Sequence, residues 1–224
     1  MKALLLVGSP RGKRSTSYSL GTYLLSILQE RGFEIKTLIV KLELASDKKV
    51  ETMLKEVNAS DVIILTAPLY DDSQPYIVVK LMELIAAKEM KLDTKRFIPI
   101  INCGFFESVH ITAVAISIYH QFAKTMNLRW VGSLAIGGGE MFGGARGKLL
   151  DDLGKIADKM KMVLFDVAEK LSSDVNIGDL VPMVFPKLFD VKLLKKGFIK
   201  MNNRSWKKQA EINGGKVDAK PYLE

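Results

Sequence analysis

The 224-residue chain contains few of the side chains that bind metal ions or form disulfides. Cys103 is the only cysteine, so neither an internal disulfide nor a thiolate cluster for zinc or iron–sulfur can form. The only histidines, His110 and His120, are ten residues apart, a spacing that places them on different faces of one helix. We therefore expect no metal site.

Long apolar runs are also missing. No apolar run reaches the roughly 18 residues of a membrane-spanning helix. The stretch before Gly8 is too short for the apolar core of a signal peptide. With 48% hydrophobic residues the chain can still bury a substantial core, and we expect a cytoplasmic protein.

The chain lacks an excess of acidic residues, since its net charge is +8 and its pI is about 9.4. The basic excess is concentrated in the last thirty residues, from Lys195 on, whereas earlier basic residues are interleaved with Asp and Glu as on solvated helix faces. This pattern indicates a property of the tail rather than a nucleic-acid-binding stripe, so we expect no nucleic-acid partner.

The most informative stretch is the first seventeen residues. Ala3 to Val7 is wholly apolar, as in a strand buried on both faces, and it ends at Gly8. Apolar residues at helical spacing begin at Leu20. Between the two lies a hydroxyl-rich, basic turn, which at the N-terminus of a helix would favour an anion through free N–H groups and the helix dipole. An ordinary N-cap on a surface turn is the alternative.

The same alternation continues along the chain. Further strand-like segments are expected at residues 33–40, 61–66, 96–102 and 129–136, and helices at 47–58, from Pro75, at 109–126 and at 146–171. This pattern predicts an α/β fold: a flavodoxin-like five-stranded parallel sheet in the order 2-1-3-4-5, with helices on both faces. Pro99 is unfavourable inside a central strand, so we expect a bulge or a shift in register there.

Three further loops are expected at the carboxyl edge of the sheet, where ligands bind in such folds. They span residues 67–75, 102–107 and 137–144. The first contains Tyr70, and the other two contain glycines that allow a backbone to approach a ligand. An anion site beside an aromatic ring and glycine-bearing loops suits a phosphate that carries a flat ring.

The motifs Gly8-Ser9-Pro10-Arg11, Ser15-Thr16-Ser17 and Ala67-Pro68-Leu69-Tyr70, with Pro75 and Lys80, resemble the NAD(P)H-dependent FMN reductase family of the flavodoxin-like superfamily. The chain is also similar to the flavodoxin domain of iron–sulfur flavoproteins, but without their cysteine cluster. The resemblance covers residues 1–171, which we expect to form the FMN-binding domain. Residues 172–224 are then a C-terminal extension.

The resemblance implies an FMN-dependent oxidoreductase that takes hydride from NAD(P)H onto the flavin and passes electrons to a quinone, a nitro or azo compound, or free flavin. The cofactor supplies that chemistry, so no catalytic acid or base is expected. Relatives of this kind are usually homodimers or homotetramers. The residues implied to hold FMN are, for the phosphate, Ser9, Arg11, Ser15, Thr16 and Ser17, and, along the ring, Pro68, Leu69, Tyr70, Asp71, Cys103, Gly104, Phe105 and Glu107.

The chain departs from the family pattern at Asp71-Asp72-Ser73, where an aromatic residue and a glycine are common. Two carboxylates near the ring would disfavour an anionic reduced flavin and lower its potential. A flavodoxin-like electron carrier without reductase turnover, or an interaction protein that has lost the flavin, are therefore alternatives. Tyr70 as a rim aromatic, and Cys103 as a small buried hydrophobe, are the alternatives for single residues.

The extension begins with an apolar, proline-punctuated segment at 177–189, followed by basic residues interleaved with apolar ones. Such a segment needs a surface to cover it. An arm packed on the domain or on a neighbouring subunit is the favoured interpretation, and a basic amphipathic element at a membrane surface is the alternative.

Overall fold

The computed structural model describes residues 1–88, 90, 92–104, 111–142, 147–180, 192–216 and 218. The chain divides into two compact units, Met1–Pro182 and Met183–Glu224, which are described separately below. The expected site residues Phe105 and Glu107 lie outside the described residues, as does most of the apolar segment 177–189.

The first unit is built on a parallel sheet. Its strands are β1 (Lys2–Val7), β2 (Glu34–Ile39), β3 (Val62–Pro68), β4 (Arg96–Asn102), β5 (Arg129–Trp130), β6 (Gly132–Ile136) and β7 (Gly178–Leu180). The order is β2-β1-β3-β4-β6-β7, with β5 beside β4. The α/β class and the order of the first four strands are confirmed, whereas the expected count of five is wrong.

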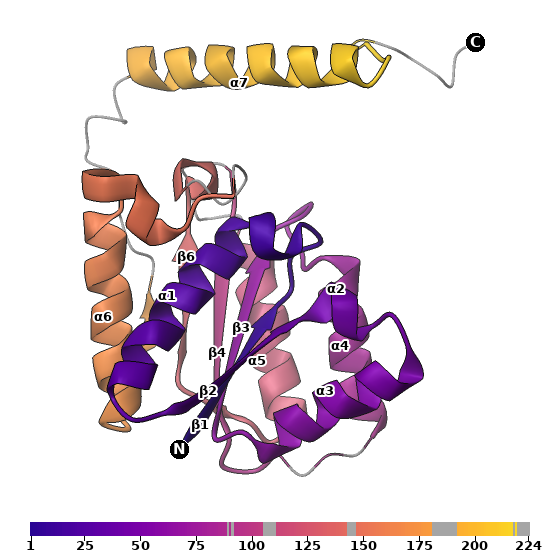
Figure 1. Cartoon of the computed structure of the whole chain (residues 1–224), viewed down its shortest axis with the longest axis vertical. Helices are drawn as coiled ribbons and strands as arrows, with labels where there is room; N and C mark the ends of the chain where they lie inside the picture. Colours follow the sequence, from indigo (N-terminus) through magenta and orange to yellow (C-terminus); the bar gives the residue numbers. More distant parts are fainter. Residues whose placement is uncertain are drawn as a thin grey trace. The chain divides into compact units, whose positions relative to one another are not determined.

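Helices cover both faces of the sheet (Figure 1). On one face α1 (Thr16–Glu30) packs beside α6 (Asp158–Ser172), and a Cβ added at Gly21 of α1 would lie 2.5 Å from Leu5, so this helix approaches the sheet closely. On the other face, alternate strand residues such as Leu4 and Ile63 share a buried cluster with α3 (Asp47–Ala59), α4 (Tyr76–Ala87) and α5 (Ile116–Thr125). Burial on both faces explains why the strands are continuously apolar.

The additional strands arise at Pro99 and beyond residue 171. β3 pairs with β4 without interruption, but on the other side Phe97 pairs with Trp130 and Ile100 with Leu134, so the partner has one residue more between these pairs. Phe97 O accepts from Val131 N, which shows that the backbone N–H and C=O groups of odd-numbered residues of β4 point towards β5 and β6. Pro99 has no N–H to donate there. The expected irregularity therefore lies in the strand opposite Pro99, which it divides into β5 and β6.

β7 adds an edge strand from the segment that we assigned to the extension. It pairs with β6 from Gly132↔Gly178 to Leu134↔Leu180. Gly132 has a φ of +132°, and a Cβ there would lie 2.2 Å from Gly178 O, so this pairing requires glycine at 132. The sheet-bearing unit therefore continues to residue 182.

The expected single helix at 146–171 is wrong. Gly154, at φ +54°, kinks the 3-10 segment η5 (Leu150–Ile156), and the α-helix α6 begins only at Asp158. Leu149 and Ile156 are 43% and 57% exposed, so they do not belong to a buried helix face. The stripe that is buried belongs to α6 and consists of Met160, Leu164, Val167, Ala168 and Leu171.

Four further short elements lie in the described part of the first unit: η1 (Gly12–Arg14), α2 (Val40–Glu43), the π-helical turn η2 (Ile111–Ala115) and η3 (Gly139–Phe142). The second unit contains α7 (Lys192–Ile212). Among the helices that the structure describes, none combines the length and the hydropathy needed to cross a bilayer.

An ion-pair cluster at the amino edge of the sheet joins β4, β5 and the end of α6. The buried Arg96 guanidinium donates to Leu171 O at 2.6 Å and to Asp174 Oδ1 at 3.2 Å, and Arg129 donates to Asp174 Oδ1 at 3.0 Å. The hydrogen bond from Arg129, with the charge of Arg96, lowers the pKa of Asp174 below its ordinary value of 3.8. Asp174 also has a φ of +56°, which asparagine tolerates equally well.

We predict that Asp174→Asn lowers the free energy of unfolding at pH 7 and that this deficit disappears in acid. A carboxylate whose pKa is lowered by folding stabilises the protein above its unfolded pKa, and that contribution is lost as pH falls from about 3.8 through the lower folded pKa. Urea unfolding of both proteins at pH 7 and at successively lower pH tests this. A deficit that is the same at every pH would contradict the ion-pair explanation.

Candidate functional site

The turn between β1 and α1 forms the start of the site. Ser15 is the N-cap of α1: its Oγ accepts from Tyr18 N at 3.1 Å and donates to Gly12 O at 2.6 Å, and its carbonyl accepts from Ser19 N. The bond to Tyr18 N satisfies one of the four N–H groups that have no carbonyl acceptor within the helix, and the bond from Ser19 N is the first of the regular helical bonds. The N–H groups of Thr16 and Ser17 remain for a ligand at the positive end of the α1 dipole.

The serine and threonine hydroxyls of this turn have different roles. Thr16 Oγ1 is buried and donates to Gly139 O at 2.9 Å, and Ser17 Oγ accepts from Asn102 Nδ2 at 2.9 Å. Both therefore link α1 to the loops after β6 and β4. Ser9 is also buried, but its Oγ accepts from Arg11 N at 3.4 Å, and no described residue receives its O–H. Ser15 and Thr16 thus donate their hydroxyl hydrogens within the protein, whereas no described residue receives the hydrogen of Ser9 or of Ser17.

The loop after β3 is a tight hairpin turn. Tyr70 and Ser73 exchange two backbone hydrogen bonds of 2.9 Å, and the two residues between them, Asp71 and Asp72, have φ values of +46° and +60°. A two-residue turn with positive φ at both positions is the type I′ arrangement, which favours Asn, Asp and Gly. The departure from the family pattern at these positions therefore has a local explanation. It leaves Tyr70 46% exposed and both carboxylates exposed.

Gln74 anchors this hairpin and was not expected to contribute. Its buried side chain donates from Nε2 to Ala115 O at 2.9 Å, and its Oε1 accepts from Ser73 Oγ at 3.0 Å. Ala115 is the last residue of η2, the π-helical turn that leads into α5. Gln74 therefore holds the β3 loop against the helix that follows β4. Only the placement of a long amide just before Pro75 could have indicated this from the sequence.

Asn102, at the end of β4, connects more of the site than any residue that sequence analysis selected. Its Nδ2 donates to Ser17 Oγ at 2.9 Å and to Ala67 O at 3.1 Å, so it joins α1, β3 and β4. A Cβ added at Gly139 would lie 2.8 Å from Asn102 Oδ1, which shows how closely the loop after β6 approaches. The expected glycine run therefore has a packing role, because a side chain at 139 would not fit beside Asn102. A backbone bond from Gly139 N to Cys103 O, at 2.7 Å, also joins the two loops.

The structure describes most, but not all, of the residues expected along the ring. Leu69 N donates to Asn102 O at 2.8 Å, so the Pro68–Tyr70 segment and the Cys103–Gly104 segment lie side by side. Cys103 is the only cysteine of the chain and is buried, as expected for a small hydrophobe, while Gly104 is exposed. Among the described residues no cluster of His, Cys, Asp and Glu could hold a metal ion.

The hydrogen-bond donors of the turn between β1 and α1, residues 8–17 and hereafter the first turn, fit a phosphate group. Residues 8–17 contain no carboxylate and include Arg11, Lys13 and Arg14, so the charge there is positive. The N–H groups of Thr16 and Ser17, the Ser9 hydroxyl and the exposed Arg11 are all donors, which is what a phosphate with acceptor oxygens requires.

Comparisons with known proteins agree with this description. A sequence model of the family described as NADPH-dependent FMN reductase matches residues 1–132. No curated protein matches the chain. Similar solved structures include an apo NADH:FMN oxidoreductase, with a TM-score of 0.60 and 15% identity over 79% of this chain and 90% of that one. A quinone oxidoreductase from Methanothermobacter marburgensis has a TM-score of 0.57 and 12% identity over 76% and 96% of the chains. An FMN-dependent NADH-azoreductase from Bacillus anthracis, solved with FMN, has a TM-score of 0.53 and 12% identity over 76% of this chain and 99% of that one.

Proposed function

The chain belongs to the NADPH-dependent FMN reductase family, and from this we propose that the first turn and the two loops beside it are its FMN site. The expected family, an FMN-dependent NAD(P)H oxidoreductase, is confirmed by the match over residues 1–132. The observation that carries the site is the pair of free N–H groups and the Ser9 hydroxyl at the start of α1, inside the matched region. When bound, FMN accepts hydride from NAD(P)H and passes electrons to an acceptor.

We propose separate roles for the predicted phosphate residues. The Ser9 hydroxyl, the Arg11 side chain and the N–H groups of Thr16 and Ser17 bind the phosphate. Ser15 caps α1, and the hydroxyls of Thr16 and Ser17 keep its N-terminus against the loops after β6 and β4. The side chains around the turn thus hold donors in place before the ligand arrives.

The ring-side assignment also remains a prediction for Pro68, Leu69, Tyr70, Asp71, Cys103 and Gly104. The adjacency of the two segments supports it, through the bond from Leu69 N to Asn102 O. Asp71 and Asp72 would add negative charge at this edge, which disfavours further negative charge on the ring and lowers its potential. Phe105 and Glu107 stay predictions outside the described residues.

For the electron acceptor we propose a small molecule of the quinone, nitro, azo or flavin type. The flavin, quinone and azo reductases among the similar structures support this range of acceptors. We place the reaction in the cytoplasm, where NAD(P)H is available and where the buried thiol of Cys103 stays reduced.

The test is the absorption spectrum of the purified full chain after incubation with FMN and removal of the excess. We expect flavin bands that disappear when NADPH or NADH is added without oxygen, and steady-state oxidation of the nicotinamide when a quinone is supplied. A protein that retains no flavin would overturn the site assignment. One that retains flavin but never oxidises NAD(P)H would instead establish the electron-carrier alternative.

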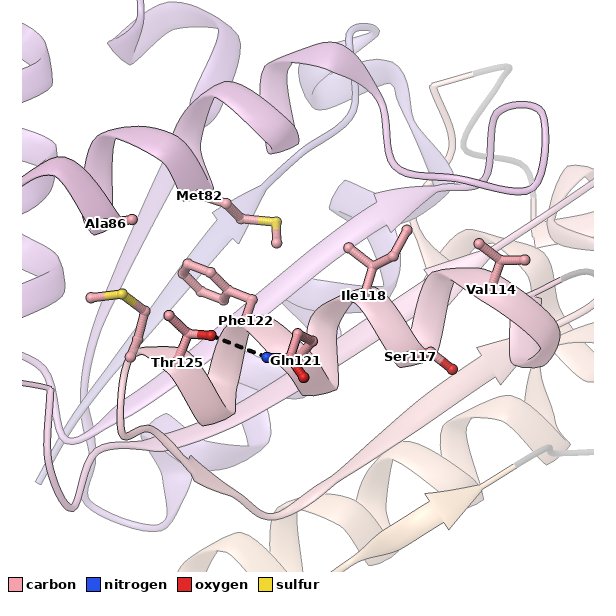
Figure 2. Close-up of a pocket in the computed structure, with 9 residues that line it drawn as sticks. Met82, Ala86, Val114, Ser117, Ile118, Gln121, Phe122 and Thr125 are labelled. Atoms are coloured by element: carbon pink, nitrogen blue, oxygen red, sulfur yellow. Dashed lines mark hydrogen bonds between the residues drawn. The ribbon is translucent and has the colours of Figure 1, made fainter.

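We further propose that the chain forms a homodimer through a shallow groove between α4 and α5. The groove has a volume of about 520 Å³, and Met82 and Ala86 of α4 face Ile118 and Phe122 of α5 across it (Figure 2). None of its nine lining residues is charged, although 26% of the chain is. Apolar surfaces depleted of charge are typical of the centre of a protein–protein interface.

Ser117→Arg, which places a charge in this groove, is expected to raise the dimer dissociation constant at least about tenfold, because an unpaired buried charge is strongly unfavourable. Ser117 is exposed in the single chain, so folding should be preserved. Sedimentation velocity over a concentration series measures the change, and Thr52→Arg on α3 is the matched control. Wild-type protein that stays monomeric at high concentration would contradict the proposal.

A further inference from the structure

Helix α7 of the second unit carries most of the net positive charge of the chain. Between Lys192 and Ile212 there are seven basic residues and one acidic residue, Glu211, a net charge of +6 out of +8 for the whole chain. The remaining residues are therefore nearly neutral overall. Such a local excess needs an anionic partner or water around it.

The described basic side chains follow one side of the helix. Lys196, Lys200, Arg204 and Lys207 are spaced three or four residues apart, so they lie on adjacent turns. With Ile199 and Asn203 they line one shallow depression along the helix. In the part of the second unit that the structure describes, none of the four has an ion-pair partner. The stripe is thus a continuous cationic surface.

Exposed apolar side chains accompany this stripe. Ile199, Met201, Trp206 and Ile212 are 48%, 55%, 72% and 67% exposed. By helical spacing Ile199 and Trp206 border the cationic stripe. Exposed apolar groups of this size beside cations are typical of helices that lie in a membrane interface, where tryptophan is enriched.

We propose that α7 binds the surface of an anionic lipid bilayer and so brings the reductase to the membrane. The cations would meet the lipid phosphates, while the apolar side chains enter the boundary of the acyl chains. Lying flat, 21 residues extend about 30 Å along the surface. The charges of the helix exclude a spanning orientation, because charged side chains are unfavourable at the bilayer centre.

Two other partners fit less well. The groove between α4 and α5 of a second copy contains no carboxylate, so its charge does not complement α7. This observation argues against the arm on a neighbouring subunit that the sequence favoured, as far as this groove is concerned. A nucleic acid would neutralise the stripe but would leave Ile199 and Trp206 beside it in water, whereas a lipid interface buries them. The proposal does not depend on the FMN site.

The experiment is sedimentation of the full chain with vesicles of phosphatidylcholine alone and of phosphatidylcholine with phosphatidylglycerol. We expect binding to the anionic vesicles only, weakened by salt because the charges are screened. The triple variant Lys196→Glu, Lys200→Glu, Lys207→Glu should bind on the order of a hundredfold more weakly, from the contribution of each cation near such a surface. Lys48→Glu, Lys55→Glu, Lys88→Glu, with the same change of net charge on exposed positions of the first unit, is the matched control and should bind as the wild type does.

A second measurement separates lipid from other anions. Trp206 fluorescence should shift to shorter wavelength with anionic vesicles, and Trp206→Ser should weaken vesicle binding without changing any weak binding to duplex DNA. Equal loss in the control variant, absence of binding to anionic vesicles at low salt, or tighter binding to DNA than to vesicles would each overturn the proposal. FMN binding by the same variants shows that the first unit is folded.

Discussion

Replacing Asn102 by Ala is expected to lower the free energy of unfolding by about 3 kcal/mol and to weaken FMN binding at least about tenfold. The Asn102 amide donates to Ser17 Oγ and Ala67 O, and its removal leaves buried acceptors without a donor, at about 1–3 kcal/mol for each group. The same change frees the N-terminus of α1 from β3 and β4. The N–H groups that would meet the phosphate then lose their fixed direction.

Urea unfolding without ligand and a fluorescence titration with FMN measure the two effects separately. Asn58→Ala, on an exposed turn of α3, is the control and should change the stability by less than about 0.5 kcal/mol. Ser17→Ala and the double variant complete a cycle in which we expect a coupling of about 1 kcal/mol between the two side chains. Additive effects would show that the bond between them does not stabilise the site, even if Asn102→Ala folds poorly.

Ser9→Ala is expected to weaken FMN binding by about ten- to a hundredfold while leaving the affinity for riboflavin unchanged. A hydrogen bond to a charged group contributes about 1.5–3 kcal/mol, and the Ser9 hydroxyl has a hydrogen that no described residue receives. Riboflavin has the same ring but no phosphate, so it separates loss of this contact from damage to the ring-side loops. Titration of both ligands into both proteins is the measurement.

Thr16→Val should give the opposite result. Its hydroxyl donates to Gly139 O within the protein, so its loss lowers the free energy of unfolding by about 1–2 kcal/mol. The phosphate contact that we propose at Thr16 comes from the backbone N–H, which the substitution keeps. If Thr16→Val reduced FMN affinity as much as Ser9→Ala and did so without reducing stability, our division of the hydroxyls would be incorrect.

The elements that short-range patterns control could be predicted from the sequence. Strand and helix alternation, the start of α1 at the Ser15 cap and the start of α4 after Pro75 depend on residues within one or two turns of each other. The division of the fifth strand opposite Pro99 and the addition of β7 could not be predicted, because they depend on pairing between strands distant in sequence. The break at Gly154 was visible as a residue but not as a positive φ.

The first turn shows the same limit at the level of single atoms. The sequence by itself determined that hydroxyls, basic side chains and a helix N-terminus occur together at residues 9–17, and that the loops of the other strands end at the same edge. Only the tertiary structure decided which hydroxyls donate their hydrogen within the protein, which accept a bond there, and which keep a hydrogen for a ligand. Thr16 donates to Gly139, 123 residues away, and Ser17 accepts from Asn102, 85 residues away. A hydroxyl has one hydrogen to donate, and the partner that receives it is brought near by the packing of the whole sheet.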